Sequence, residues 1–105
     1  RGIKPNIIKQ NLSKIIEILQ EKNIKILLAG MLSQDTYGET YKNNFDKIFP
    51  ELSKKFQIDF LPFLLDGVAL NPELNLDDGK HPNSKGVLKI KENLEKKLIN
   101  LLDKN

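Results

Sequence analysis

The chain has 105 residues, of which 39% are hydrophobic and 30% are charged. This composition is typical of one globular domain and excludes a disordered segment. The net charge is +3, but the lysines are spread along the chain and Arg1 is the only arginine. Nucleic-acid-binding proteins concentrate Lys and Arg on one face, so nucleic acid is not an expected partner.

Three absences narrow the function further. There is no cysteine, which excludes disulfide and thiol chemistry. No apolar run approaches the ~20 residues that a membrane span needs, so no stable membrane anchor is expected. No signal peptide is visible, and the chain begins with Arg-Gly-Ile rather than Met. We therefore expect that an upstream portion is missing from this chain.

Helix and strand signals alternate along the first half. Pro5 suits the first position of a helix, and apolar residues then recur at helical spacing to about residue 22. Residues 24–29 form a short, mostly apolar run ended by Gly30, which is typical of a buried parallel strand. Residues 31–38 have no clear period and are expected to form a loop at the carboxyl end of that strand. Ligands bind there in open α/β sheets, although a plain connector is an equally good interpretation.

The alternation continues in the second half. A helix is expected over residues 39–56, where Pro50 predicts a kink or a break. Residues 58–61 are predicted to form a second short strand, and residues 63–70 a short helical turn.

A last helix is expected from Asn83 to about residue 102, with Asn83 or Ser84 as its N-cap. Gly86 lies early in that helix, where a missing side chain would permit close approach to a strand. The order helix–strand–helix–strand–helix predicts an α/β fold with two short parallel strands and three main helices.

The only histidine lies in a turn-forming stretch, residues 76–86. A four-residue turn from Asp78 to His81 would bring its end Cα atoms within ~7 Å, so that the carboxylate can meet the imidazole. Gly79 relieves backbone strain in such a turn, and Pro82 keeps His81 out of a helix. A carboxylate bound to one ring nitrogen leaves the other free to take a proton, which is the arrangement of an acid–base pair.

Other interpretations of this stretch stay open. A single histidine beside an aspartate in a loop is more often a surface or capping residue than a base. A metal site is less favoured, because Asp77, Asp78 and His81 offer at most three ligands and no second His or Cys exists. No metal and no cofactor are therefore expected.

The block that contains His81 resembles the last signature block of the SGNH, or GDSL-type, hydrolases. That block is D-x-x-H followed by Pro or Leu, Asn and a Gly. Further residues fall in the order and spacing of the branch that contains bacterial acyl-CoA thioesterases, lysophospholipases and arylesterases. The matching residues are Arg1-Gly2, Tyr37-Gly38, Tyr41-Lys42, Asn44-Phe45, Ile48-Phe49-Pro50, Leu52, Leu61-Pro62-Phe63, Asp78 to Asn83, and Gly86.

This resemblance covers nearly the whole chain and implies the C-terminal part of a flavodoxin-like, three-layer α/β/α fold. Residues 1–105 are then the C-terminal part of a single SGNH hydrolase domain. The resemblance further implies that Asp78 is the acid and His81 the base of a Ser-His-Asp triad, with Asp77 a neighbour. The implied activity is that of an esterase, lipase, acyl-CoA thioesterase or lysophospholipase, which hydrolyses an acyl ester or thioester through an acyl-enzyme.

The substrate and the partner are predicted from position. Met31, Leu32 and Tyr37 are expected to contact the acyl chain, because their loop leaves a parallel strand at its carboxyl end. Resemblance to the family places the missing strands beside residues 24–29, where their loss exposes a strand edge. The expected partner is therefore the missing N-terminal half or a second copy of this chain.

The family's nucleophile motif, Gly-Asp-Ser, and its Gly-x-Asn-Asp block do not occur in this sequence. The serines are Ser13, Ser33, Ser53 and Ser84, and none has the context of a nucleophile elbow. The chain alone is therefore expected to be inactive. The runner-up function is a noncatalytic α/β interaction or binding module, in which the turn at His81 is structural. A periplasmic or secreted location is implied by the family resemblance.

Overall fold

A computed structural model describes residues 3–103, with the backbone alone at Asp35. Arg1 and Gly2, which contribute to the family resemblance, lie outside the described residues. The elements are α1 (Pro5–Glu21), β1 (Leu27–Ala29), α2 (Glu39–Asp46), α3 (Ile48–Phe56), β2 (Asp59–Leu61) and α4 (Ser84–Asp103), with 3₁₀ turns η1 (Asp35–Tyr37) and η2 (Pro72–Leu74). The two strands are parallel and lie between two helical layers, which confirms the α/β prediction.

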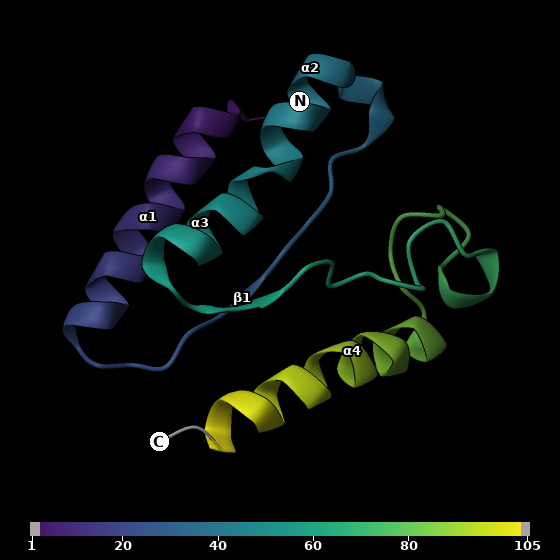
Figure 1. Ribbon diagram of the computed structural model, residues 1–105. Helices are drawn as coiled ribbons and strands as arrows, with labels where there is room; N and C mark the ends of the chain where they lie inside the picture. The colour runs from purple at the N-terminus through teal and green to yellow at the C-terminus, as the bar shows by residue number, and fades with distance from the viewer. Residues whose placement is uncertain (1–2, 104–105) are drawn as a thin grey trace.

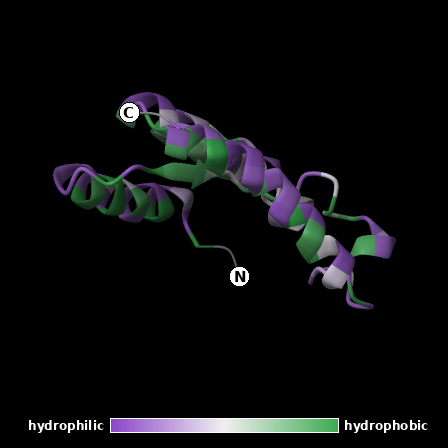
Figure 2. Ribbon diagram, turned by 90° about the horizontal axis from the view of Figure 1, so that it is seen from below, coloured by the Kyte–Doolittle hydropathy of each residue, from purple (hydrophilic) through white to green (hydrophobic). Residues whose placement is uncertain are grey.

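The layers are clear in two orthogonal views. In Figure 1, α1 and α3 lie on one side of the strands and α4 on the other. Figure 2 shows the sheet from below, between the N-terminal helices and the C-terminal helix. The described chain is flat, with extents of 42 × 33 × 16 Å. No helix within residues 3–103 is long and apolar enough to cross a membrane.

Both strands begin later than the sequence predicted, at Leu27 instead of residue 24 and at Asp59 instead of residue 58. The cause is helix termination. The backbone N–H groups of Ile24 and Ile58 donate to carbonyls in the last turn of the preceding helix, at 3.0 and 3.1 Å. Since these amides close α1 and α3, they are not available for the sheet ladder.

The predicted effect of Pro50 is confirmed. The helix expected over residues 39–56 is divided into α2 and α3 at Lys47, three residues before the proline. Pro50 has no N–H to donate to the carbonyl of Asp46, and its ring would clash with that carbonyl in a continuous helix. The break therefore occurs one turn before Pro50, which itself sits in the first turn of α3.

The main core lies between the sheet and the helices α1 and α3. In the paired strands, Leu28 stands opposite Phe60, and side chains at paired positions point to the same face. Leu28 belongs to the buried cluster and Phe60 packs against it. The buried members are Ile16, Leu28, Ile48, Phe49 and Leu52. On the other face, Leu61 of β2 is buried, and α4 contacts both strands.

The start of α4 is fixed by local contacts. Asn83 is its N-cap, because its Oδ1 accepts a hydrogen bond of 2.9 Å from the N–H of Gly86. Ser84 is instead the first helical residue. Gly86 does permit a close approach, but to the backbone of η2 and not to a strand as predicted. A Cβ at this position would lie 2.1 Å from the carbonyl oxygen of Leu74.

Two helices carry apolar side chains that the described residues leave exposed. On α1 these are Ile7, Ile15 and Ile18, and on α4 they are Val87, Leu88, Leu98, Ile99 and Leu102. Within residues 3–103 no third strand pairs with the outer edge of β1 or of β2. The sheet is therefore too narrow to cover the apolar surface of its own helices.

Candidate acid–base site

Asp78 and His81 contact each other through their side chains, with 2.5 Å between Asp78 Oδ2 and His81 Nδ1. The other carboxylate oxygen, Oδ1, accepts hydrogen bonds from the backbone N–H groups of Lys80 (2.9 Å) and His81 (3.1 Å). Gly79 has a φ of +69°, a conformation that favours glycine, and its N–H donates to the carbonyl of Leu76. The turn thus brings the carboxylate and the imidazole together as an i, i+3 pair.

These contacts determine the charge state of the carboxyl group. The hydrogen bond from the His81 ring is the largest cause, followed by the N–H groups of Lys80 and His81. Together they hold the pKa of Asp78 well below its usual range. Because Asp78 is an acceptor when ionised, Nδ1 of His81 carries the hydrogen of this bond. In the neutral imidazole Nε2 is then the acceptor, which is the tautomer that a general base requires.

The site is open on one side. The side chain of His81 is 74% exposed and that of Asp78 is 45% exposed. Among residues 3–103, Nε2 of His81 has no hydrogen-bond partner. The described chain therefore orients the imidazole but does not cover the face at which a base would act.

The base of the turn is closed by backbone contacts. Asn75 and Pro82 form an isolated antiparallel bridge. The N–H of Leu76 donates to the carbonyl of His81 at 2.7 Å. The turn is therefore the tip of a short hairpin that rests on Asn75 and Pro82.

Asn83 ties this hairpin to the segment before it. Its backbone N–H donates to the carbonyl of Leu74 at 3.0 Å. Its side-chain Nδ2 donates to the carbonyls of Glu73 (2.8 Å) and Asn75 (3.2 Å). The sequence analysis recognised Asn83 as a cap but missed this second role and the burial of Asn75. A polar residue between two leucines is the sequence signal that could have drawn attention to Asn75.

The three residues predicted to contact the acyl chain have different surroundings. Met31 packs against the main core, whereas Leu32 and Tyr37 are 47% and 43% exposed. The ring of Tyr37 lies on that of Tyr41, with 5.1 Å between the centroids. These three residues do not line the hollow between α4 and the segment after β2, nor the hollow between α1 and the helices α2 and α3.

An ion pair anchors this loop to α2. Lys42 Nζ lies 2.8 Å from Asp46 Oδ2 and donates to the carbonyl of Ser33 at 3.0 Å. The N–H of Ser33 in turn donates to Asp46 Oδ1 at 2.7 Å. Both charged side chains are partly buried, and their contacts with Ser33 hold the backbone beside Leu32.

Three serine hydroxyls are engaged with backbone carbonyls. Ser13 donates to Lys9, and Ser53 donates to Pro50, both within their own helices. Ser33 donates to the carbonyl of Gln34. These contacts do not resemble a hydroxyl activated by a base.

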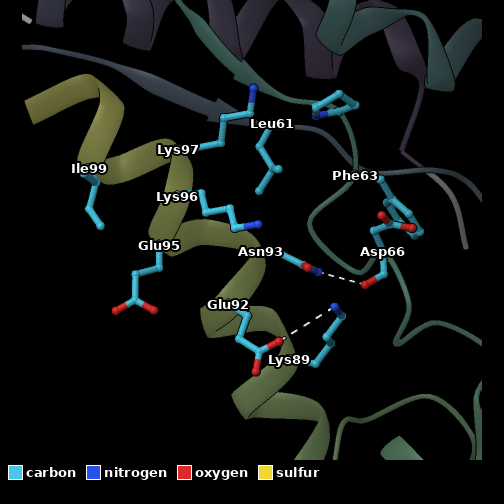
Figure 3. A pocket seen from close by; sticks show the side chains of 11 residues that line it. Leu61, Phe63, Asp66, Lys89, Glu92, Asn93, Glu95, Lys96, Lys97 and Ile99 are labelled. Carbon is cyan, nitrogen blue, oxygen red and sulfur yellow. Dashed lines mark hydrogen bonds and ion pairs between the residues drawn. The ribbon is translucent and has the colours of Figure 1, made fainter. Parts of the chain in front are cut away.

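One hollow of the described chain lies away from the Asp78–His81 pair. It has a volume of about 710 Å³ and is open to solvent between α4 and the segment that follows β2 (Figure 3). Asn93 lines this hollow, and its Nδ2 donates to the carbonyls of Leu64 (3.1 Å) and Asp66 (2.8 Å).

Among the described residues, no group of three His, Cys, Asp or Glu side chains could hold a metal ion.

Comparisons with known proteins were made by sequence and by structure. No family model matches the sequence. The chain is 31% identical over 99 residues to an arylesterase of Vibrio mimicus, covering 94% of this chain and 50% of that protein. It is 36% identical over 83 residues to the thioesterase 1/protease 1/lysophospholipase L1 of Escherichia coli K12, covering 79% of this chain and 40% of that protein.

Comparison with solved structures also finds esterases. The structure of AlinE4, an SGNH-hydrolase family esterase, superposes with a TM-score of 0.71 at 36% identity. The match covers 99% of this chain and 55% of AlinE4. The chain belongs to the SGNH hydrolase family. A crystal structure of TesA superposes with a TM-score of 0.87 at 27% identity, and the match covers 96% of this chain and 56% of the TesA chain. The chain spans about half the length of the curated relatives that it matches.

The contact between Asp78 and His81 predicts a measurable titration. A carboxyl group whose pKa is lowered by folding stabilises the fold at pH values above its unfolded pKa. That stability is lost as the pH falls through the folded pKa. We expect the Asp78 carboxyl carbon, followed by ¹³C NMR, to titrate well below the usual aspartate range. His81→Ala should raise the pKa of Asp78, since it removes the largest cause of the shift.

The control is Lys9→Ala, which breaks an ion pair with Glu51 between α1 and α3. It should leave the titration of Asp78 unchanged. An Asp78 carboxyl that titrates at the same pH with and without the His81 imidazole would contradict this account.

Proposed function

We propose that residues 1–105 are the C-terminal part of a single SGNH hydrolase domain. In this proposal Asp78 and His81 are the acid and base of a Ser-His-Asp triad, which hydrolyses carboxylic esters or thioesters through an acyl-enzyme. The observation that carries the proposal is the 2.5 Å contact between Asp78 Oδ2 and His81 Nδ1. The similarity to an arylesterase and to a thioesterase/lysophospholipase supports the choice of reaction.

The chemistry follows from the tautomer of His81. Nε2 takes the proton of the serine hydroxyl while the serine oxygen bonds to the acyl carbon of the substrate. The same proton passes to the alcohol or thiol that leaves when the C–O or C–S bond breaks. Nε2 then takes a proton from a water whose oxygen bonds to the acyl carbon. It gives that proton to the serine oxygen as the bond between this oxygen and the acyl carbon breaks, which releases the carboxylic acid. Asp78 keeps Nδ1–H oriented and stabilises the imidazolium formed in each step.

The N-terminal part of the domain supplies the serine and the oxyanion donors in this proposal. The exposure of His81 supports this assignment, because a base must meet its nucleophile within hydrogen-bond reach. The serines of the chain itself do not fit the role, since Ser13, Ser33 and Ser53 are bonded to backbone carbonyls.

The triad assignment is tested by paired variants in the complete protein, assayed with p-nitrophenyl esters and an acyl-CoA. His81→Ala should remove nearly all kcat and leave the protein folded at the assay temperature, because the side chain of His81 is exposed. Asp78→Asn should lower kcat on the order of 10⁴-fold through the wrong tautomer. Asp77→Asn is the matched control and should cost far less.

The 105-residue chain by itself should hydrolyse no ester above background, since loss of the nucleophile costs on the order of 10⁶ in kcat. A clear rate from the chain alone that is abolished by His81→Ala would refute the division of the triad. A larger loss for Asp77→Asn than for Asp78→Asn would refute the choice of acid.

We further propose that the N-terminal part of the domain covers the outer edge of β1 and the apolar flanks of α1 and α4. An unpaired strand edge is a template for another chain, and exposed apolar surface of this extent is unusual for a monomer. The exposed residues on α1 and α4 support the proposal, since a two-stranded sheet cannot cover them. A second copy of the chain is the alternative occupant.

Sedimentation velocity of the purified chain tests this association. We expect a dimer or larger species, or binding of an apolar dye, when the chain is alone at micromolar concentration. Addition of the N-terminal part should give a 1:1 complex that no longer binds the dye. A folded monomer with a cooperative melting transition and no dye binding would show that the chain is self-sufficient.

The acyl chain, we propose, contacts the loop of Met31, Leu32 and Tyr37. Leu32 and Tyr37 are exposed, and the ion pair of Lys42 with Asp46 holds the backbone beside Leu32. These features support a rigid apolar wall, although Met31 also packs against the core.

Substitution of the exposed pair should therefore change selectivity more than stability. In the complete protein, Leu32→Ala and Tyr37→Ala should shift the preferred acyl-chain length, measured as kcat/KM over a series of p-nitrophenyl esters. Ile24→Ala is a control, because Ile24 is similarly exposed but lies before β1. If the three variants and the unaltered protein preferred the same acyl-chain length, the loop would be a plain connector and the proposal would be refuted.

A further inference from the structure

The position of His81 is determined at the base of its hairpin. The tip of the hairpin is exposed, and among the described residues the His81 side chain is hydrogen-bonded to Asp78 alone. The hairpin is closed by the Asn75–Pro82 bridge and by the hydrogen bond from Leu76 N–H to the His81 carbonyl. Any shift of Asn75 is therefore passed to the backbone of His81.

Asn75 is the buried polar residue of this base, with 9% of its surface exposed. Its Nδ2 donates two hydrogen bonds of 2.8 Å, to the carbonyls of Val68 and Asn71. Val68 is itself almost completely buried, at 1% exposure. The amide of Asn75 thus connects the hairpin to a rigid turn that precedes it in the chain.

We propose that Asn75 is a positioning residue, which sets the orientation of the His81 imidazole by anchoring the hairpin to the carbonyls of Val68 and Asn71. Its catalytic consequence rests on the proposed function, but its structural consequence does not. A primary amide suits this task because its two N–H groups can serve two carbonyls at once. A side chain without these donors fills the space but removes the anchor to Val68 and Asn71, while the contacts of Asn83 remain.

The fold can survive loss of this amide. The carbonyl of Val68 also accepts from the N–H of Asn71, at 3.1 Å, and the carbonyl of Asn71 accepts from the N–H of Leu74, at 3.1 Å. Neither carbonyl is left unpaired when the side chain of Asn75 changes. The expected effect is therefore a loss of precision at His81 and not unfolding.

The experiment compares Asn75→Leu, Asn75→Gln and Asn71→Ala in the complete protein, this chain together with the N-terminal part of its domain. Asn75→Leu should lower kcat about ten- to a hundredfold with little change in KM, because misplacement of about 1 Å is enough for such a loss. It should also raise the pKa of the Asp78 carboxyl, measured by ¹³C NMR, since the bond to His81 is weakened. Asn75→Gln retains both donors and should recover much of the kcat and of the titration shift.

Asn71→Ala is the matched control. It removes the side-chain cap on Glu73 N–H but keeps the Asn71 carbonyl that Asn75 uses. It should change neither readout. If Asn75→Leu melts below the assay temperature, Asn75→Ser, which keeps one donor, is judged by the same two readouts.

Unchanged kcat and an unchanged Asp78 titration in the folded Asn75 variant would overturn the proposal. Equal losses in the Asn71→Ala control would overturn it as well. A titration that moves in Asn75→Leu, in a protein that hydrolyses no ester even when unaltered, would support the positioning role while refuting the proposed function.

Discussion

The parallel pairing of β1 with β2 is the constraint on which the rest of this chain depends. Each strand contributes three residues, in the register Leu27 to Asp59 through Ala29 to Leu61. Two strands about 4.8 Å apart form a narrow support for helices about 10 Å in diameter. With 17 residues in α1 and 20 in α4, these helices are roughly 25 and 30 Å long. The sheet can therefore bury only a stripe of each helix.

Two glycines allow close approach of backbone segments, Gly30 at the end of this sheet and Gly86 in α4. Gly30 N–H donates to the carbonyl of Leu61 at 2.7 Å, and its own carbonyl accepts from Leu64 at 3.0 Å. A Cβ on Gly30 would lie 2.3 Å from the carbonyl oxygen of Pro62. Gly86 plays the same part where α4 meets η2. The hydrogen bonding between the two segments thus continues beyond the last paired residues of the strands.

The acid–base pair is built differently from this packed framework. Asp78 and His81 are three residues apart, and their contact is formed within one exposed turn. A charge-assisted hydrogen bond between groups so near in the chain is short and strong. Its direction, in contrast, depends on a base that contains the buried Asn75 and the capping residue Asn83. The short separation in sequence brings the two side chains together, and the tertiary contacts of Asn75 and Asn83 orient the turn that carries them.

The sequence by itself determined the features that arise within a few residues. Pro50 divides α2 from α3 because it lacks the N–H that a continuous helix needs. Asn83 caps α4 because its side chain reaches the N–H three residues later. The turn from Asp78 to His81 is equally local, and so the orientation of the two side chains could be anticipated. The family resemblance rests on the same short blocks.

Only the tertiary structure decided the features that depend on residues far apart in the chain. The strands are shorter than predicted because Ile24 and Ile58 donate to the helices that precede them, which a pattern of apolar residues does not reveal. Gly86 packs against the carbonyl of Leu74 and not against a strand, because the first turn of α4 lies against η2. The burial of Asn75 likewise follows from the turn that folds over it. The spacing of apolar residues in the sequence indicates which face of a helix or strand is apolar. Which element covers that face depends on the tertiary packing.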